Sequence, residues 1–203
     1  MSGKKRTPSQ VGKGSKQKGS NFENEISKRI RKYFIPGVDK KTAYNLVHRT
    51  GMSGGRTERG DLIVQPPLLS YFPWFVEARN RQSWSWENIF KKGKDSVIFK
   101  WYLEDACDKC HPYAGDPRNE RYPLLVFTKN QDMWYVMASE EDLLSATDCL
   151  PVDFRGYYRY IWDRETRGKH GVSGSAVILP FEDFIEAHDN LLEGVDFDSL
   201  EFK

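Results

Sequence analysis

Apolar residues recur at helical spacing in the segment between residues 20 and 36. The residues that repeat are Phe22, Ile26, Ile30 and Phe34. Residues four apart lie on one face of a helix, so the pattern predicts an amphipathic helix. Ser20–Glu23 has the S-x-x-E form of a capping box, and Pro36 followed by Gly37 is a typical helix end. We therefore expect ordered structure to begin at Ser20 and the helix to end before Pro36.

Short apolar runs bounded by turn-forming residues predict β-strands further along the chain. The candidate strands are residues 43–49, 61–64, 74–78, 124–128, 133–137 and 176–179. The spacer between the second and third runs is short, which favours a hairpin or meander. Helices are expected at residues 86–92, at 95–109, from 139 onward and at 180–192. Irregular segments are expected at residues 111–122 and 150–172.

The resulting order is a helix, three strands, helices, two strands and a helix. This order is typical of a mixed sheet with helices on its faces, so we predict an α/β fold. Residues 19–203 are enough for a single domain with one core. Residues 1–18 consist mainly of Gly, Ser, Lys and Gln and contain almost no apolar side chains, which predicts a disordered basic tail.

Charge is distributed unevenly along the chain. The 203 residues carry a formal charge of +2, and residues 1–20 hold six basic residues and no acid, so the remainder carries −4. A mobile basic arm gains contacts to nucleic-acid phosphates because each neutralised phosphate releases counterions. On charge alone, a solubilising tail that contacts nothing is an equal alternative.

The chain contains no run of 18 apolar residues, so we expect no membrane span, and its three cysteines fit a reducing cytoplasm. Cys107, Cys110 and His111 resemble half of a zinc site, but a structural zinc needs four ligands, usually as two such pairs. The remaining candidate ligands are Cys149, His170 and His188. Because these three are not paired in the sequence, we favour buried thiols and do not expect zinc.

Two acids interrupt apolar runs. Asp61 begins one candidate strand and Glu77 lies near the end of another. A buried acid must be hydrogen-bonded, paired or bound to metal, and we expect the two strands to be neighbours, so that the carboxylates converge. Two or three carboxylates are what Mg²⁺ needs from a protein, since it retains waters and binds phosphate oxygens. Such an ion would polarise a phosphate and lower the pKa of a bound water.

Four segments in a fixed order carry a family pattern. They are Lys18–Glu23, Arg49–Gly54, Gly60–Val64 and Val76–Arg79. This set resembles the PD-(D/E)XK nucleases and, among them, Holliday junction resolvases of the archaeal and phage type. The resemblance implies a restriction-endonuclease-like fold, Mg²⁺ (replaceable by Mn²⁺) and metal ligands at Glu23, Asp61 and Glu77. It also implies branched DNA as substrate, a symmetric homodimer, and a cytoplasmic location in a bacterial, archaeal or phage-infected cell.

Position 79 departs from the pattern, because Arg79 stands where the family has a lysine. In the family, that lysine orients or deprotonates the attacking water and stabilises the developing charge. Arginine can do only the second, since it stays protonated in proteins. The catalytic residues that we expect are Glu23, Asp61, Glu77 and Arg79. Three outcomes are open: Arg79 acts electrostatically, Lys91, Lys92 or Lys94 replaces the lysine, or the protein binds DNA without cutting it.

Five basic residues and one serine are candidate DNA contacts. They are Lys18, Arg49, Ser53, Arg56, Arg59 and Arg81. The turn at residues 51–56 is also compatible with an ordinary surface loop, and Trp84 and Trp86 suit either base stacking or the core. Local alternatives exist for the acids as well. Glu23 could cap the first helix, Asp61 could serve a turn, and Glu77 could pair with Arg79 on one strand face.

These observations support three functional hypotheses. The first is a Mg²⁺-dependent endonuclease that cuts branched DNA in one step with a metal-bound water. The second is a degenerate module of the same fold that binds DNA without cutting it, which Arg79 supports. The third is another PD-(D/E)XK nuclease that acts on duplex DNA.

Overall fold

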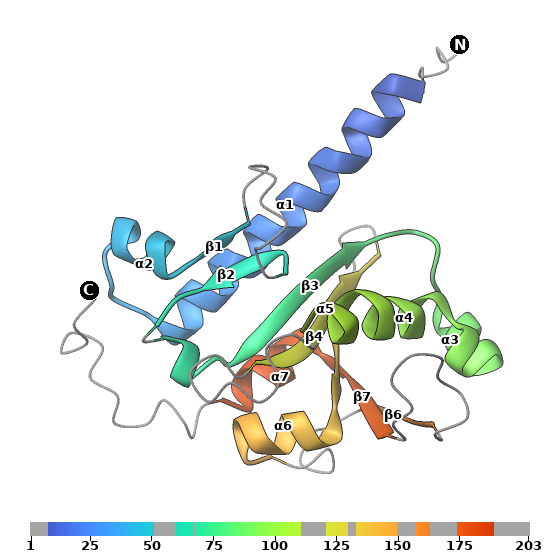
Figure 1. The fold of residues 1–203 in the computed structure, drawn as a ribbon. Coiled ribbons are helices and arrows are strands. Elements are labelled where there is room, and N and C mark those ends of the chain that lie inside the picture. The colour runs from blue at the N-terminus through green and yellow to red at the C-terminus, as the bar shows by residue number, and fades with distance from the viewer. Residues whose placement is uncertain are drawn as a thin grey trace.

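A mixed five-stranded sheet forms the centre of the protein (Figure 1). The computed structural model describes residues 8–50, 60–66, 68–110, 121–129, 133–149, 157–162 and 174–188. The strands are β3 (Trp74–Asn80), β4 (Tyr122–Thr128), β5 (Tyr135–Ser139), β6 (Tyr158–Trp162) and β7 (Gly174–Pro180). Their order is β3-β4-β5-β7-β6. The β3–β4 pair is parallel and the other pairs are antiparallel, which confirms the predicted mixed α/β class.

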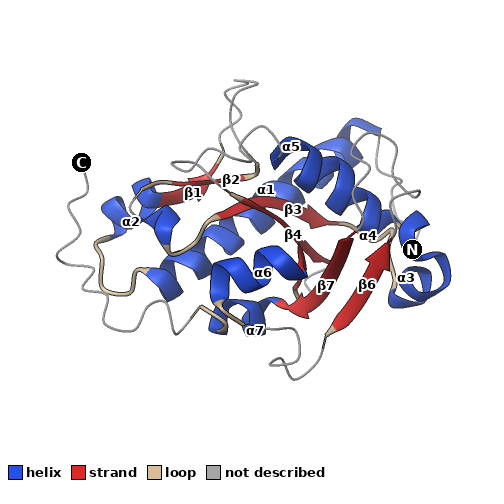
Figure 2. Cartoon of the chain, turned by 60° about the horizontal axis from the view of Figure 1, so that its bottom comes forward, coloured by secondary structure: helices blue, strands red, loops and turns tan. Residues whose placement is uncertain are grey.

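Helices cover both faces of this sheet. One face is covered by α1 (Pro8–Phe34), α6 (Glu140–Thr147) and α7 (Phe181–Glu186), and the last two lie beside β7 (Figure 2). The other face is covered by α3 (Trp86–Lys92), α4 (Val97–Lys100) and the π-helical segment η3 (Trp101–Cys107), which continues into α5 (Asp108–Cys110). Short 3-10 turns, η1 (Leu68–Ser70) and η2 (Gly93–Asp95), connect elements.

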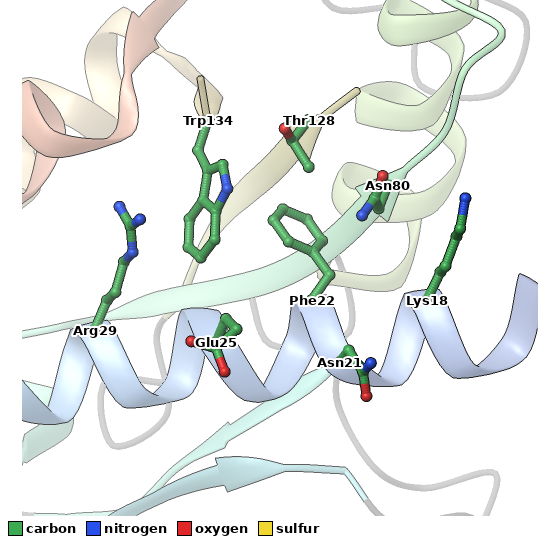
Figure 3. A pocket seen from close by; sticks show the side chains of 8 residues that line it. All are labelled: Lys18, Asn21, Phe22, Glu25, Arg29, Asn80, Thr128 and Trp134. Atoms are coloured by element: carbon green, nitrogen blue, oxygen red, sulfur yellow. The ribbon is translucent and has the colours of Figure 1, made fainter. Parts of the chain in front are cut away.

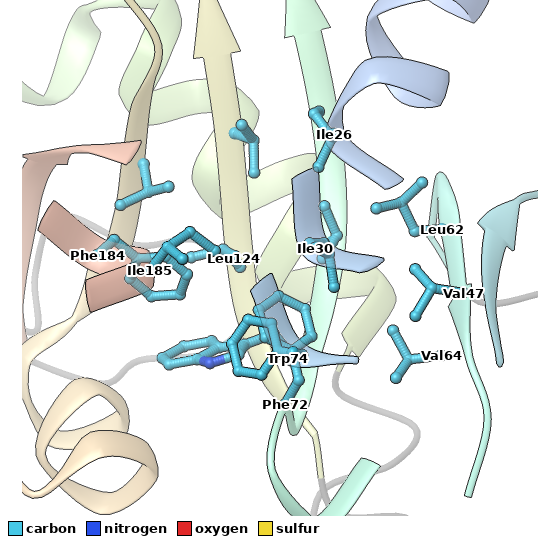
Figure 4. Packing of buried hydrophobic residues seen from close by; sticks show 14 of the residues in the cluster. Ile26, Ile30, Val47, Leu62, Val64, Phe72, Trp74, Leu124, Phe184 and Ile185 are labelled. Atoms are coloured by element: carbon cyan, nitrogen blue, oxygen red, sulfur yellow. The ribbon is translucent and has the colours of Figure 1, made fainter. Parts of the chain in front are cut away.

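Successive side chains of a central strand pack on opposite faces of the sheet. In β4, Leu124 and Val126 pack toward α1, whereas Leu125 and Phe127 pack toward α4 and η3. Figure 4 shows Ile26 and Ile30 of α1 against the first of these faces. A strand that is apolar on both sides is typical of a sheet buried between two helical layers. Polar side chains in β3, an edge strand of this sheet, are therefore exceptional and need partners.

The first helix begins earlier than the capping-box pattern predicted. It starts at Pro8, so Ser20 lies inside the helix and the capping role considered for Glu23 is wrong. Residues 8–18, which the composition assigned to a disordered tail, are helical and extend past the sheet (Figure 1). Proline suits a first helical turn, and no proline follows until residue 36. The helix, which is anchored by its buried apolar face, therefore continues from Ser20 back to Pro8.

Two strand predictions need correction. The run at 43–49 is helical in its first half, because Asp39 accepts hydrogen bonds from Lys41 N and Thr42 N and caps α2 (Lys40–Leu46). The remainder forms β1 (Val47–Arg49), which pairs antiparallel with β2 (Leu62–Val64). The predicted pairing of 61–64 with 74–78 is therefore wrong, although β2 still lies beside β3.

Other elements follow the sequence more closely. The helix predicted at residues 86–92 is confirmed as α3, with Ser85 as its cap. Residues 150–172, predicted to be irregular, contain β6, whose strand character is supplied by pairing with β7. Within the described residues, no helix has both the length and the apolar character needed to cross a membrane.

Candidate active site

Asp61 is fixed on the open edge of β3. Its backbone N–H donates to the Val76 carbonyl at 2.8 Å, and its carboxylate Oδ2 accepts from the Ala78 N–H at 2.8 Å. Because β3 pairs within the sheet only with β4, these two backbone groups would otherwise point outward from the edge. The side chain is thus held beside the next residue of β3, Glu77.

Gly60 makes this close approach possible. Its φ is +78°, in the left-handed region that favours glycine, and a Cβ there would lie 2.6 Å from the Val76 carbonyl oxygen. A glycine at position 60 is therefore required by the contact between the start of β2 and the edge of β3.

Glu77 is a buried acid with one incompletely satisfied oxygen. Its residue is 1% exposed, and Oε1 accepts from Lys109 Nζ at 2.9 Å. Arg79 Nη2 lies 3.1 Å from Oε2 but is not oriented to donate, so Oε2 has no hydrogen bond among the described residues. Burial, and then the negative charge of Asp61, raise the pKa of Glu77 to about 7, against the opposing effect of Lys109 and Arg79.

Arg79 is held by acids from two elements. Its Nε and Nη2 donate to Asp105 Oδ2 at 3.1 and 2.5 Å. Its Nη1 donates to Asp61 Oδ2 at 3.2 Å and to the Ala78 carbonyl at 2.9 Å. The guanidinium therefore connects β3, the start of β2 and η3, and its orientation is fixed by these contacts.

Asp105 and Lys109 are functional candidates that the sequence did not reveal. They lie four residues apart and reach Arg79 and Glu77 from the helical layer. Their neighbours Ala106 and Cys110 are buried, so both polar residues border the buried face of that layer. The only sequence signal is that they flank an apolar stripe, and this does not show which strand they meet.

Glu23 approaches the site from α1 and is paired with Arg49. Arg49 Nε donates to Glu23 Oε2 at 2.6 Å. Burial raises the pKa of Glu23; the hydrogen bond from Arg49 lowers it, and the charge of Asp61 raises it further. The influence of Asp61 places Glu23 in electrostatic range of Asp61. Arg49, a predicted DNA contact, is the partner of Glu23 in this structure.

The acids do not form a preassembled metal cage. Among the described residues, no group of three or more acidic, histidine or cysteine side chains could hold a metal ion as placed. Each predicted ligand is bound to a cation: Glu23 to Arg49, Asp61 to Arg79 and Glu77 to Lys109 and Arg79. The donor chemistry nevertheless fits Mg²⁺, because the available atoms are carboxylate oxygens and one of them is buried without a hydrogen bond.

A hollow of about 510 Å³ lies between α1 and the ends of β3 and β4 (Figure 3). Its lining residues are Lys18, Asn21, Phe22, Glu25, Arg29, Asn80, Thr128 and Trp134. Lys18, a predicted DNA contact, is therefore on the rim of this cavity, which is not lined by Glu23, Asp61 or Glu77. Arg29 stacks over Trp134 with its Cζ atom 3.8 Å from the ring centre.

The other predicted DNA contacts are placed only in part. Arg81 follows β3 and is exposed, with its N–H donating to the Thr128 carbonyl. Ser53, Arg56 and Arg59 lie outside the described residues. Trp84 is buried in the core and donates to the same Thr128 carbonyl, whereas Trp86 is half-buried and stacks on Phe90.

The cysteines have local partners. Cys110 is buried, its Sγ lies 3.0 Å from the Arg121 carbonyl oxygen, and burial raises the pKa of the thiol to about 12. His188 is buried and accepts from the Trp74 indole at 3.0 Å. His111 and His170 lie outside the described residues.

A mixed sheet flanked by helices, with a cluster of acids at the open edge of a strand, is consistent with a restriction-endonuclease-like fold. Comparison with protein families gives the more specific assignment. Residues 14–189 match the model of the family described as "Phage putative PDDEXK endonuclease". The chain belongs to this family, which confirms the predicted PD-(D/E)XK superfamily and supports a nuclease. No curated protein and no solved structure matched the chain.

Proposed function

We propose that the protein is a divalent-metal-dependent endonuclease that hydrolyses DNA phosphodiesters at the edge of β3. The observation that carries this proposal is the buried Oε2 of Glu77, which has no hydrogen bond among the described residues. Glu77 lies between Val76 and Ala78, the two residues of β3 whose backbone binds Asp61. Burial leaves this acid with a pKa of about 7, so a divalent cation would stabilise its ionised form.

The residues of the site divide into ligands and supports. Asp61 and Glu77 would hold Mg²⁺, or Mn²⁺ in its place, and Glu23 would bind it through water. When bound, the ion supplies a polarised phosphate and a water of lowered pKa. Gly60 and the backbone of β3 keep Asp61 in place, while Arg79 holds Asp61 near Glu77 and neutralises part of the negative charge.

DNA would approach across the hollow beside α1. Lys18 on the hollow and Arg81 after β3 supply exposed positive charge. Arg49 would be free to bind a phosphate if Glu23 turned to the metal. The loop carrying Ser53, Arg56 and Arg59 follows Arg49 in sequence and would add phosphate contacts. We further propose branched DNA as substrate, cut by a symmetric homodimer in the cytoplasm of a phage-infected cell, because two strands of a junction must be cut in a related way.

The test is cleavage of a four-way junction and of linear duplexes with Mg²⁺ or Mn²⁺. We expect nicking of the junction in preference to the duplex. Asp61→Asn should reduce cleavage by about 10³-fold or more, because it weakens metal binding without removing the side chain. Asp39→Asn is the matched control, since Asp39 caps α2 on an exposed surface. Preferential cutting of linear duplex would replace the junction assignment with a duplex nuclease.

A second candidate is a module that binds DNA without cutting it. The observation that favours it is that three acids form ion pairs with Arg79. Arg79 therefore cannot take the role that the lysine has in the family pattern. If this candidate is correct, the protein binds the junction in Ca²⁺ or in chelator and does not cleave it in Mg²⁺ or Mn²⁺. Any cleavage that depends on Asp61 would exclude it.

A further inference from the structure

Lys109 is the cation that reaches Glu77 from the helical layer. Its Nζ donates to Glu77 Oε1 at 2.9 Å, and Asp105 Oδ1 lies 3.9 Å from the same nitrogen, beyond hydrogen-bond length. A lysine ammonium has three donors, so among the described residues Glu77 uses one of them. The Lys109 side chain is 49% exposed, so the ammonium sits between a buried acid and solvent.

Arg79 has the opposite character. Its side chain is 19% exposed, and it donates to Asp105, to Asp61 and to the Ala78 carbonyl. A planar guanidinium held in this way cannot turn toward a water or a phosphate without breaking several charge-assisted hydrogen bonds. Arg79 therefore acts on the arrangement of the acids and not on a substrate.

We infer that Lys109 supplies the catalytic cation that the PD-(D/E)XK pattern places at position 79, and that Arg79 is a positioning residue. This inference rests on the proposed nuclease function. Lys109 would donate hydrogen bonds to the attacking water and to the oxygen of the phosphate on which charge develops. Its compact ammonium on a flexible stem can make these contacts while Glu77 turns toward a metal ion.

Lys91, one of the three lysines suggested by the sequence, has a different partner. Lys91 pairs with Glu87 at 2.5 Å on α3, where both side chains are 71% exposed. This pair provides a matched control, because removing the charge of Lys91 breaks an ion pair without touching the acids at the edge of β3.

The experiment compares Lys109→Met with Lys91→Met and the wild type in three measurements. These are junction cleavage in Mg²⁺ or Mn²⁺, junction affinity in Ca²⁺, and Mn²⁺ affinity of the protein without DNA. We expect Lys109→Met to cut about 10²–10³-fold more slowly, the loss typical of one electrostatic group in an active site. Both affinities and the melting temperature should change little, with affinities within about fivefold, as for a partly exposed ion pair.

Two further variants separate catalysis from structure. Lys109→Arg keeps the positive charge and should restore part of the cleavage rate. Arg79→Lys in the Lys109→Met background should cut no faster than Lys109→Met, although it restores the lysine of the family pattern. Cleavage regained by this double variant would place the catalytic cation at position 79 and overturn the inference.

Other outcomes are equally decisive. Unchanged cleavage by Lys109→Met, with Asp61→Asn inactive, would overturn the role of Lys109 and leave the nuclease function intact. If Lys109→Met lowered the cleavage rate, the metal affinity and the melting temperature together, Lys109 would be a structural residue. A wild-type protein that cuts no substrate in either metal would overturn the proposed function and this inference together.

Discussion

Glu77 combines burial with the charge of a neighbouring acid, and both effects oppose its ionisation. The resulting pKa of about 7 is well above the ordinary value of 4.5. Lys109 and Arg79 offset part of the penalty, but within the described part of the chain Oε2 accepts no hydrogen bond. The site therefore holds a carboxylate whose affinity for a proton is raised for the same reasons that would raise its affinity for a metal cation.

The pH dependence at Glu77 follows from the direction of this shift. The folded protein binds the proton more tightly than the unfolded chain, so the stability that this proton contributes is fully present below pH 4.5 and is lost as the pH rises through about 7. Without metal, the wild type should therefore lose more stability than Glu77→Gln between pH 5.5 and pH 8. Denaturant unfolding in chelator at both pH values measures the difference.

The same titration controls metal binding. Mn²⁺ affinity of the wild type should rise between pH 6 and pH 8, with release of about one proton per ion, because the metal requires the ionised acid. Glu77→Gln should bind Mn²⁺ weakly and without this dependence. An affinity that is constant over the range in the wild type would show that Glu77 is not a ligand.

At the scale of elements, the site is made where β2 begins against the edge of β3. Asp61 satisfies two backbone groups of β3 that have no strand partner, and Gly60 allows the approach. From the other side, η3 delivers Asp105 to Arg79. Short irregular contacts, and not a continuous sheet, thus bring the acids together.

Gly60 tests this contact. Gly60→Ala adds a Cβ 2.6 Å from the Val76 carbonyl oxygen at a φ of +78°, and should cost about 1–3 kcal/mol of stability from strain. Because the collision lies beside Asp61, metal affinity and cleavage should fall as well. Gly37→Ala is the matched control, since its φ is +92° but a Cβ there meets nothing within 4 Å. Gly37→Ala should lower the stability and leave the metal affinity unchanged. Equal metal affinity in Gly60→Ala and Gly37→Ala would contradict the role of Gly60.

The sequence predicted those elements whose signals are local. The helix predicted at residues 86–92 has the bounds of α3, and apolar runs predicted four of the five strands of the central sheet, β3, β4, β5 and β7. The proximity of Asp61 and Glu77 also followed from their positions in such runs. The pairing of the strands did not follow from the sequence. β2 pairs with β1, and the length of the segment between them does not show which strand is its partner. Asp105 and Lys109 could not be assigned, since their contacts depend on how a helical layer packs on the sheet.

At the scale of the molecule, one end of α1 is fixed and the other extends outward. The helix is buried along Phe22, Ile26, Ile30 and Phe34, whereas its first turns project past the sheet (Figure 1). The family match includes residue 14, so part of this extension belongs to the family pattern. Lys18, near this extension, borders the hollow.

Neutralising the positive charge of the N-terminal arm tests whether the arm binds DNA. Five basic residues precede Lys18 in the sequence: Lys4, Lys5, Arg6, Lys13 and Lys16. Replacing all five with glutamine should weaken junction and duplex binding alike and reduce the salt slope of log K by up to about 4–5, since each phosphate contact contributes about 0.9. Mn²⁺ affinity and melting temperature should stay unchanged, because the proposed metal site is at the edge of β3. Replacing Lys28, Lys40, Lys41, Lys91 and Lys100 with glutamine removes the same charge from exposed positions elsewhere. If both sets reduce the slope equally, the arm acts only through net charge and makes no phosphate contacts of its own.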